Sequence, residues 1–154
     1  MSNKGIEDII KNSLHGDTQQ NALDFIEYLK ENNMIAGGEH GAVSYNDQPV
    51  CYMHIDSSED MPGPWTIWTE GDYSGENVID SVDEHDKEIA WEHVNYCGNC
   101  GGNCSPGIHK VIFGKEFDNV CNADMAFYMP NAETLECVKK LLLMRKNYID
   151  STLS

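Results

Sequence analysis

Apolar residues recur at helical spacing in three parts of the chain, and each stripe predicts a helix with one buried face. The first stripe lies within residues 3–14. The second helix is expected to begin near Asp17 or Thr18 and to run to about Asn33, and the last follows Asn131, a good N-cap. The predicted buried faces of these two helices consist of Ala22, Phe25, Ile26 and Leu29, and of Leu135, Val138, Leu142 and Ile149. Such faces need a partner layer, most simply a sheet.

Segments of alternating, β-branched and aromatic residues between these helices predict strands. The predicted strands are residues 42–45, 50–55, 65–69, 108–113 and 124–129. The first two flank the turn sequence Asn46-Asp47-Gln48-Pro49 and therefore predict a hairpin. A further helix is expected from Ser81, which forms a capping box with Glu84, to about Tyr96.

This order of elements predicts a single α+β domain over residues 1–154. Its core would be a mostly antiparallel sheet of about four to five strands packed with three to four helices. We expect the helix within residues 1–16 to pack more loosely than the others. Residues 97–121 are expected to form a metal-binding insertion that contains a cysteine-rich loop.

The charge of the chain excludes two classes of expected partner. The formal net charge is −16, from 10 basic and 26 acidic side chains among 154 residues. Such a surface repels a phosphate backbone and an anionic membrane, so neither nucleic acid nor membrane is an expected partner. The chain shows no secretory signal and no apolar run of membrane-spanning length, so a cytoplasmic location is expected.

Cysteine spacing gives the most specific indication of function. Cys97, Cys100 and Cys104 are separated only by glycine and asparagine, and Cys121 follows one predicted strand later. Thiols stay reduced in the cytosol, so clustered cysteines favour metal or redox chemistry over disulfides. The segment Cys97-Gly98-Asn99-Cys100-Gly101 resembles a zinc knuckle. Structural zinc takes four ligands in a tetrahedron, and Cys97, Cys100, Cys104 and Cys121 are the predicted Zn²⁺ ligands.

Two histidines are alternative ligands in place of Cys104 or Cys121. His109 follows Cys104 by five positions, and His93 precedes Cys97 by four, a spacing that one helical face would share. The same cysteines would also suit an iron–sulfur cluster or a redox-active thiol pair. The redox interpretation is weakened if the pair closes a helix, because the dipole there disfavours a thiolate.

Aromatic residues suggest a second kind of site. Tyr52, Trp65, Trp68 and Trp91 would line a ligand pocket or belong to the core. No His-Glu-x-x-His, phosphate loop, dinucleotide fingerprint or Gly-x-Ser-x-Gly elbow is present. We therefore expect a non-enzymatic zinc protein that acts as a regulatory module or binds a small molecule or a protein. The alternatives are a metal-dependent enzyme, a thiol-redox enzyme and an iron–sulfur protein that use the same cysteines.

Overall fold

The computed structural model describes residues 3–36, 41–55, 65–69, 82–96 and 107–153. The chain divides into two compact units. The first unit combines Met1–Trp68 with Phe127–Ser154, and the second unit is Thr69–Ala126.

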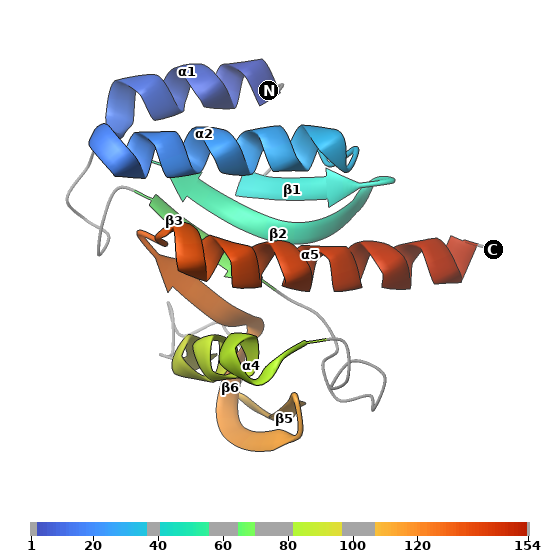
Figure 1. The fold of residues 1–154 in the computed structure, drawn as a ribbon. Helices are drawn as coiled ribbons and strands as arrows, with labels where there is room; N and C mark the ends of the chain where they lie inside the picture. The colour runs from blue at the N-terminus through green and yellow to red at the C-terminus, as the bar shows by residue number, and fades with distance from the viewer. Residues whose placement is uncertain (1–2, 37–40, 56–64, 70–81, 97–106, 154) are drawn as a thin grey trace. The chain divides into compact units, whose positions relative to one another are not determined.

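The described elements confirm the α+β class (Figure 1). The helices are α1 (Asn3–Ser13), α2 (Gly16–Glu31), α4 (Glu84–Glu92) and α5 (Ala132–Leu153). The strands are β1 (Ala42–Tyr45), β2 (Gln48–Ile55), β3 (Trp65–Thr69), β4 (Val94–Tyr96), β5 (Ile108–Ile112) and β6 (Lys115–Tyr128). They form one six-stranded sheet in the order β1-β2-β3-β6-β4, with β5 also paired to β6. The sheet is therefore larger than the predicted four to five strands.

Two helices of the first unit bury the faces that the sequence predicted. All four predicted positions of α2 and all four of α5 are buried. Asn131 caps α5, because its Oδ1 accepts a hydrogen bond from the Thr134 N–H at 2.8 Å. Figure 1 shows α2 and α5 side by side over β1 and β2, with α1 along the outer side of α2. From β3, Trp65 is fully buried, with its ring centroid 6.4 Å from that of Phe25.

The hairpin between β1 and β2 is confirmed. Its loop is the two residues Asn46 and Asp47, with φ of 50° and 65°, and Tyr45 is the register partner of Gln48. Two positive φ values in a two-residue loop are typical of a type I′ turn, whose twist matches that of the flanking strands. The β5–β6 hairpin has the same form, with φ of 49° at Phe113 and 83° at Gly114.

The predicted third helix is wrong at both ends. Asp83, not Ser81, is the N-cap of α4, since its carboxylate accepts a hydrogen bond from the Asp86 N–H at 2.9 Å. Ser81 itself lies outside the described residues. The helix ends at Glu92, and Val94–Tyr96 forms β4 instead of a last helical turn. These three residues are weak helix formers, and pairing with β6 satisfies their backbone in the sheet.

None of the described helices contains a stretch that is both long and apolar enough to cross a membrane.

Candidate metal centre

Of the four predicted ligands, only Cys121 is described. Cys97, Cys100 and Cys104 lie outside the described residues. Cys121 is a half-buried free cysteine in β6. The geometry on which the predicted site depends is therefore that of the strands on either side of residues 97–106.

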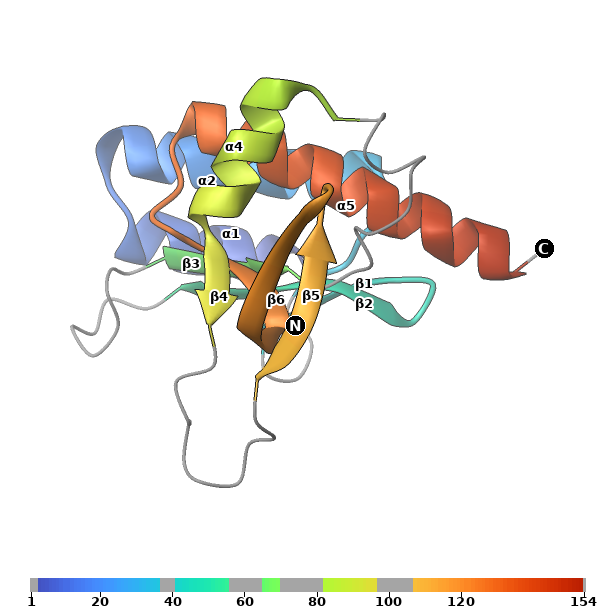
Figure 2. The ribbon, with the colours of Figure 1, turned by 90° about the horizontal axis from the view of Figure 1, so that it is seen from below.

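Those two strands meet β6 at one residue. Both β4 and β5 pair antiparallel with β6, one on each side of it (Figure 2). Tyr96, the last residue of β4, and Ile108, the first of β5, both have Val120 as their register partner. Cross-strand partners have Cα atoms about 5 Å apart. Tyr96, which precedes Cys97, and Val120, which precedes Cys121, are thus neighbours on the adjacent strands β4 and β6.

The backbone of β6 is irregular on both sides of Val120. Asn119 has a positive φ of 61°, at the point where the register with β5 shifts. On the other side of Val120, the next register pair with β4 after Tyr96–Val120 is Val94–Met125. Between these two pairs β4 has one residue, Asn95, whereas β6 has the four residues 121–124. Cys121 lies in this irregular stretch. Bulges of this kind change the direction of side chains and are common beside functional sites.

Gly107 allows β5 to approach this irregular stretch closely. A Cβ atom at position 107 would lie 2.3 Å from Oδ1 and 2.5 Å from the carbonyl carbon of Asn119. These distances are far shorter than any non-bonded contact, so only glycine fits here. The sequence Gly107-Ile108 therefore holds the chain against β6 next to Cys121.

His93 does not share a helical face with Cys97, because α4 ends at Glu92 and β4 separates the two residues. Its Nδ1 lies 2.7 Å from the Ile89 carbonyl oxygen. Its own carbonyl oxygen accepts a hydrogen bond from the Ala126 N–H at 2.9 Å. The position of His93 at the C-cap of α4 is explained by these contacts, which join the helix end to β6.

His109 is exposed and lies between two carboxylates. Its Nδ1 is 2.6 Å from Asp118 Oδ1, and its Nε2 is 3.4 Å from Glu116 Oε1. The hydrogen bond to Asp118 and the negative charges of Asp118 and Glu116 raise the pKa of His109. A metal-bound imidazole must be neutral, whereas these neighbours favour the protonated ring. The surroundings of His109 therefore work against its role as an alternative ligand.

The described residues contain no group of three or more histidine, cysteine or acidic side chains placed to hold a metal ion. Two cysteines outside the cluster, Cys51 and Cys137, are fully buried. Burial raises the pKa of the Cys51 thiol, so this residue is an unreactive part of the core.

The four aromatic residues of the predicted ligand pocket are divided between the units. Trp65 belongs to the core of the first unit, and Tyr52 and Trp68 are half-buried in the same unit. Trp91 belongs to the second unit, where it lines an open hollow with Glu88, Glu92 and Lys115.

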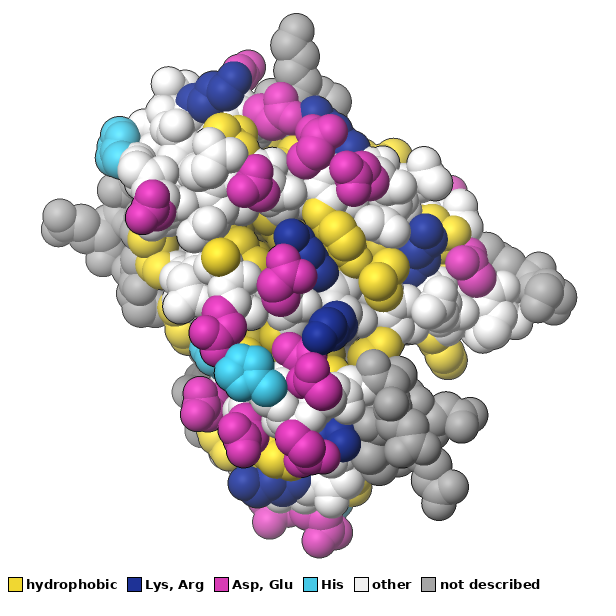
Figure 3. All heavy atoms as spheres, viewed as in Figure 1, with side chains coloured by type: hydrophobic (Ala, Val, Ile, Leu, Met, Phe, Trp, Pro, Cys, Tyr) yellow, Lys and Arg dark blue, Asp and Glu magenta, His cyan; other side chains and the backbone are white. Residues whose placement is uncertain are grey.

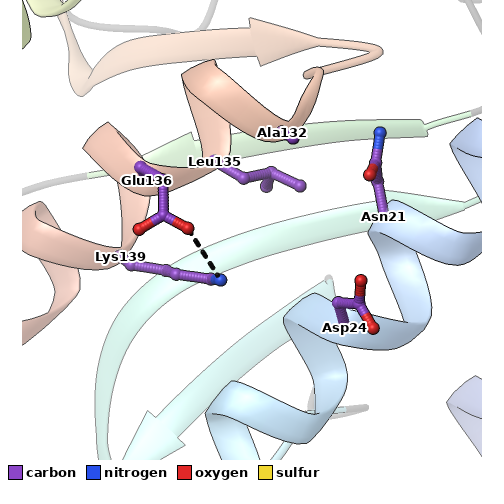
Figure 4. Close-up of a pocket in the computed structure, with 6 residues that line it drawn as sticks. All are labelled: Asn21, Asp24, Ala132, Leu135, Glu136 and Lys139. Atoms are coloured by element: carbon purple, nitrogen blue, oxygen red, sulfur yellow. Dashed lines mark hydrogen bonds and ion pairs between the residues drawn. The ribbon is translucent and has the colours of Figure 1, made fainter.

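A smaller hollow of about 80 Å³ lies between α2 and α5 in the first unit (Figure 4). Its three charged side chains are already paired, since Lys139 Nζ is 3.4 Å from Glu136 and Asp24 accepts a hydrogen bond from Gln20. Beside it, the Tyr28 hydroxyl donates to the Lys139 carbonyl oxygen at 2.9 Å. Burial, together with the charge of Glu136, raises the pKa of Tyr28 to about 12. Of these contacts, the Tyr28–Lys139 hydrogen bond joins α2 to α5.

A buried ion pair in the second unit was not predicted from the sequence. The Asp124 side chain is fully buried, and its Oδ2 lies 2.5 Å from Lys110 Nζ. Its Oδ1 accepts a hydrogen bond from the Thr69 hydroxyl at 3.3 Å. The available indication was an acidic residue that directly precedes the apolar run Met125-Ala126-Phe127 in a predicted strand. A charge in such a position is rare unless it is paired.

No protein family, curated protein or solved structure matches the chain.

Proposed function

We propose that this chain is a small zinc-binding protein in which Cys97, Cys100, Cys104 and Cys121 hold one structural Zn²⁺ ion. The observation that carries the proposal is the pairing of Tyr96 with Val120, because each of these residues directly precedes a proposed ligand. Four thiolates are a common ligand set of structural zinc, and their charge more than neutralises the ion.

The ion would have a local mechanical role. β4 has only three residues, and a strand of that length adds little stability by itself. An ion shared between Cys97 and Cys121 would join the connection after β4 to β6 by metal–sulfur bonds. The free energy of zinc binding would then stabilise the fold around the site.

We infer a non-enzymatic role for this centre, because four thiolates complete a tetrahedron and leave no position for water or substrate. The binding role then falls to the protein surface, as a module for a small molecule or a protein partner.

A thiol-redox function of Cys97 and Cys100 is the second candidate. The sequence-based objection to it was the dipole at a helix C-terminus, and the structure removes that objection because Val94–Tyr96 is a strand. In that case no metal would be bound, and the two thiols would be oxidised to a disulfide by exchange with a substrate disulfide, which would be reduced to two thiols.

Metal analysis of the purified protein tests the proposal. We expect about one zinc ion per chain, and loss of the ion in Cys97→Ser, Cys100→Ser, Cys104→Ser and Cys121→Ser. Cys51→Ala and Cys137→Ala are the matched controls, since both thiols are buried away from solvent, and both variants should keep the ion. Replacement of zinc by cobalt should give the visible absorption of a tetrahedral cobalt thiolate.

Three results would contradict the zinc site in different ways. Full metal content in Cys121→Ser would remove Cys121 from the ligand set. Brown protein that contains iron and labile sulfide would indicate an iron–sulfur cluster. Metal-free protein with a reversible Cys97–Cys100 disulfide would favour the redox function.

A further inference from the structure

An open hollow of about 370 Å³ lies beside the C-terminal half of α4 and is lined by Glu88, Trp91, Glu92 and Lys115. All four residues belong to the second unit. In Figure 3, acidic side chains gather over α4, with hydrophobic and basic side chains beside them. The hollow thus combines an aromatic surface with negative charge.

The two carboxylates of the hollow are placed where a helix does not favour them. Glu88 and Glu92 are exposed and one helical turn apart, a spacing at which like charges destabilise a helix. Glu92 is also the last residue of α4, at the negative end of the helix dipole, and the last turn contains no basic residue. Within the described ranges, neither carboxylate has a hydrogen-bond or ion-pair partner. Residues that break a local rule without compensation in the fold are candidates for function.

The aromatic surface of the hollow already accommodates a cation. The Lys115 ammonium lies 5.3 Å from the centroid of the Trp91 ring and 5.6 Å from that of Phe117. The Trp91 ring is held in place because its Nε1–H donates to the Ile112 carbonyl oxygen at 2.8 Å. This arrangement offers a fixed indole face, and a positive charge above that face is attracted by the ring quadrupole.

We propose that this hollow binds an arginine side chain from a basic segment of a partner protein. The guanidinium stacks on Trp91 in place of the Lys115 ammonium, and its N–H groups donate to Glu88 and Glu92. A planar guanidinium suits this combination better than an ammonium, because it stacks on aromatic rings and pairs with carboxylates through two parallel hydrogen bonds. The net charge of −16 attracts a basic partner over longer distances.

This inference names a partner class for the binding role proposed above, and its test does not involve the metal. A fluorescently labelled peptide of alternating arginine and glycine is titrated with the full chain, and anisotropy gives the Kd. We expect tighter binding than for a peptide with lysine in place of arginine.

Substitutions in the hollow give the sharper test. Glu88→Gln and Glu92→Gln should each weaken binding about two- to fivefold, the range expected for exposed ion pairs. Lys115→Gln should strengthen binding, because it frees the Trp91 face and removes a competing positive charge. Glu27→Gln and Glu31→Gln on α2 are the matched controls, because both residues are exposed, one helical turn apart and in the first unit.

Equal weakening by the α2 variants would overturn the proposal, since it would show that the net charge alone attracts the peptide. Equal affinity for the arginine and lysine peptides, or weaker binding by Lys115→Gln, would also overturn it. The Cys97→Ser variant separates the two proposals. If Cys97→Ser loses zinc but binds the peptide as before, the proposal for the hollow remains supported. If the unmodified chain has normal zinc content but does not bind the peptide, only the proposal for the hollow is overturned.

Discussion

His109 and Lys110 are neighbours in β5, and each pairs with an acidic residue of β6 in a different environment. The Lys110 and Asp124 side chains are 19% and 0% exposed, whereas those of His109 and Asp118 are 53% and 88% exposed. The burial of the Tyr28–Lys139 contact in the first unit lies between those of the two pairs, since Tyr28 is half-buried. Burial increases along β5 from the exposed Ile108 and His109 to the buried Ile112. We therefore expect the burial of each pair to decide how much its polar contact contributes to stability.

The largest effect is expected at the buried pair. Asp124→Ala leaves the Lys110 ammonium in a largely buried position without its carboxylate, and removal of one partner of a buried pair costs about 3–5 kcal/mol. Urea denaturation followed by circular dichroism measures the change in unfolding free energy. Asp118→Ala is the control in the same strand and should cause a far smaller loss. Equal losses in the two variants would contradict the role of burial.

A double substitution sharpens this first comparison. Lys110→Met with Asp124→Leu removes both charges together, so neither is left unpaired. We expect the double variant to be more stable than Asp124→Ala, because a well-packed apolar pair can replace a buried ion pair. A double variant that is less stable than Asp124→Ala would contradict this expectation, because removal of the unpaired Lys110 charge would then not restore stability.

Tyr28→Phe should have an intermediate effect. It removes the hydroxyl that donates to the Lys139 carbonyl oxygen, and a single hydrogen bond of this kind contributes about 1 kcal/mol. The fold raises the pKa of Tyr28 from 10.0 to about 12, so the neutral form is favoured in the folded state. The resulting stabilisation is complete below pH 10 and is lost as the pH rises from 10 toward 12. Stability measured across this range should fall less steeply in Tyr28→Phe, and identical slopes would contradict the prediction.

The smallest effect is expected at His109. The Asp118 carboxylate raises the pKa of His109 above its ordinary value of 6.5, so the pair favours the folded state when the ring is protonated. This contribution is complete below pH 6.5 and is lost as the pH rises through the higher pKa of the folded protein. NMR titration of the ring should show a lower pKa in Asp118→Asn. His109→Gln should remove a small decline in stability above pH 6.5.

The sequence predicted best the elements that local patterns define. The buried faces of α2 and α5 follow the helical period of their apolar residues, and the Asn46-Asp47 turn follows from residues that tolerate positive φ. β4 was missed because its three residues become a strand only through pairing with a segment far along the chain. The first half of β6 was missed because charged residues interrupt its alternation from Lys115 to Asp118.

The candidate sites were predictable to different degrees. Cysteine spacing alone indicated the metal ligands, but the placement of Cys121 beside Tyr96 depends on the register of β4 with β6, which no local pattern contains. The hollow at Trp91 combines residues of α4 with Lys115 of β6, so it follows from tertiary structure. The sequence indicated that Trp91 could line a ligand pocket, but it did not indicate Glu88, Glu92 or Lys115 as its neighbours there.

The shared partner Val120 has a thermodynamic consequence. Because Tyr96 and Ile108 are both held against one residue of β6, strand pairing has already closed the interval of the chain between them. An ion bound there would meet a reduced entropic cost of loop closure, and its affinity would be coupled to the integrity of the two strand pairs. Such coupling is reciprocal. A substitution such as Gly107→Ala opens the β5–β6 contact and should therefore lower the affinity for the ion. The factor by which the affinity falls should equal the factor by which the bound ion strengthens that contact.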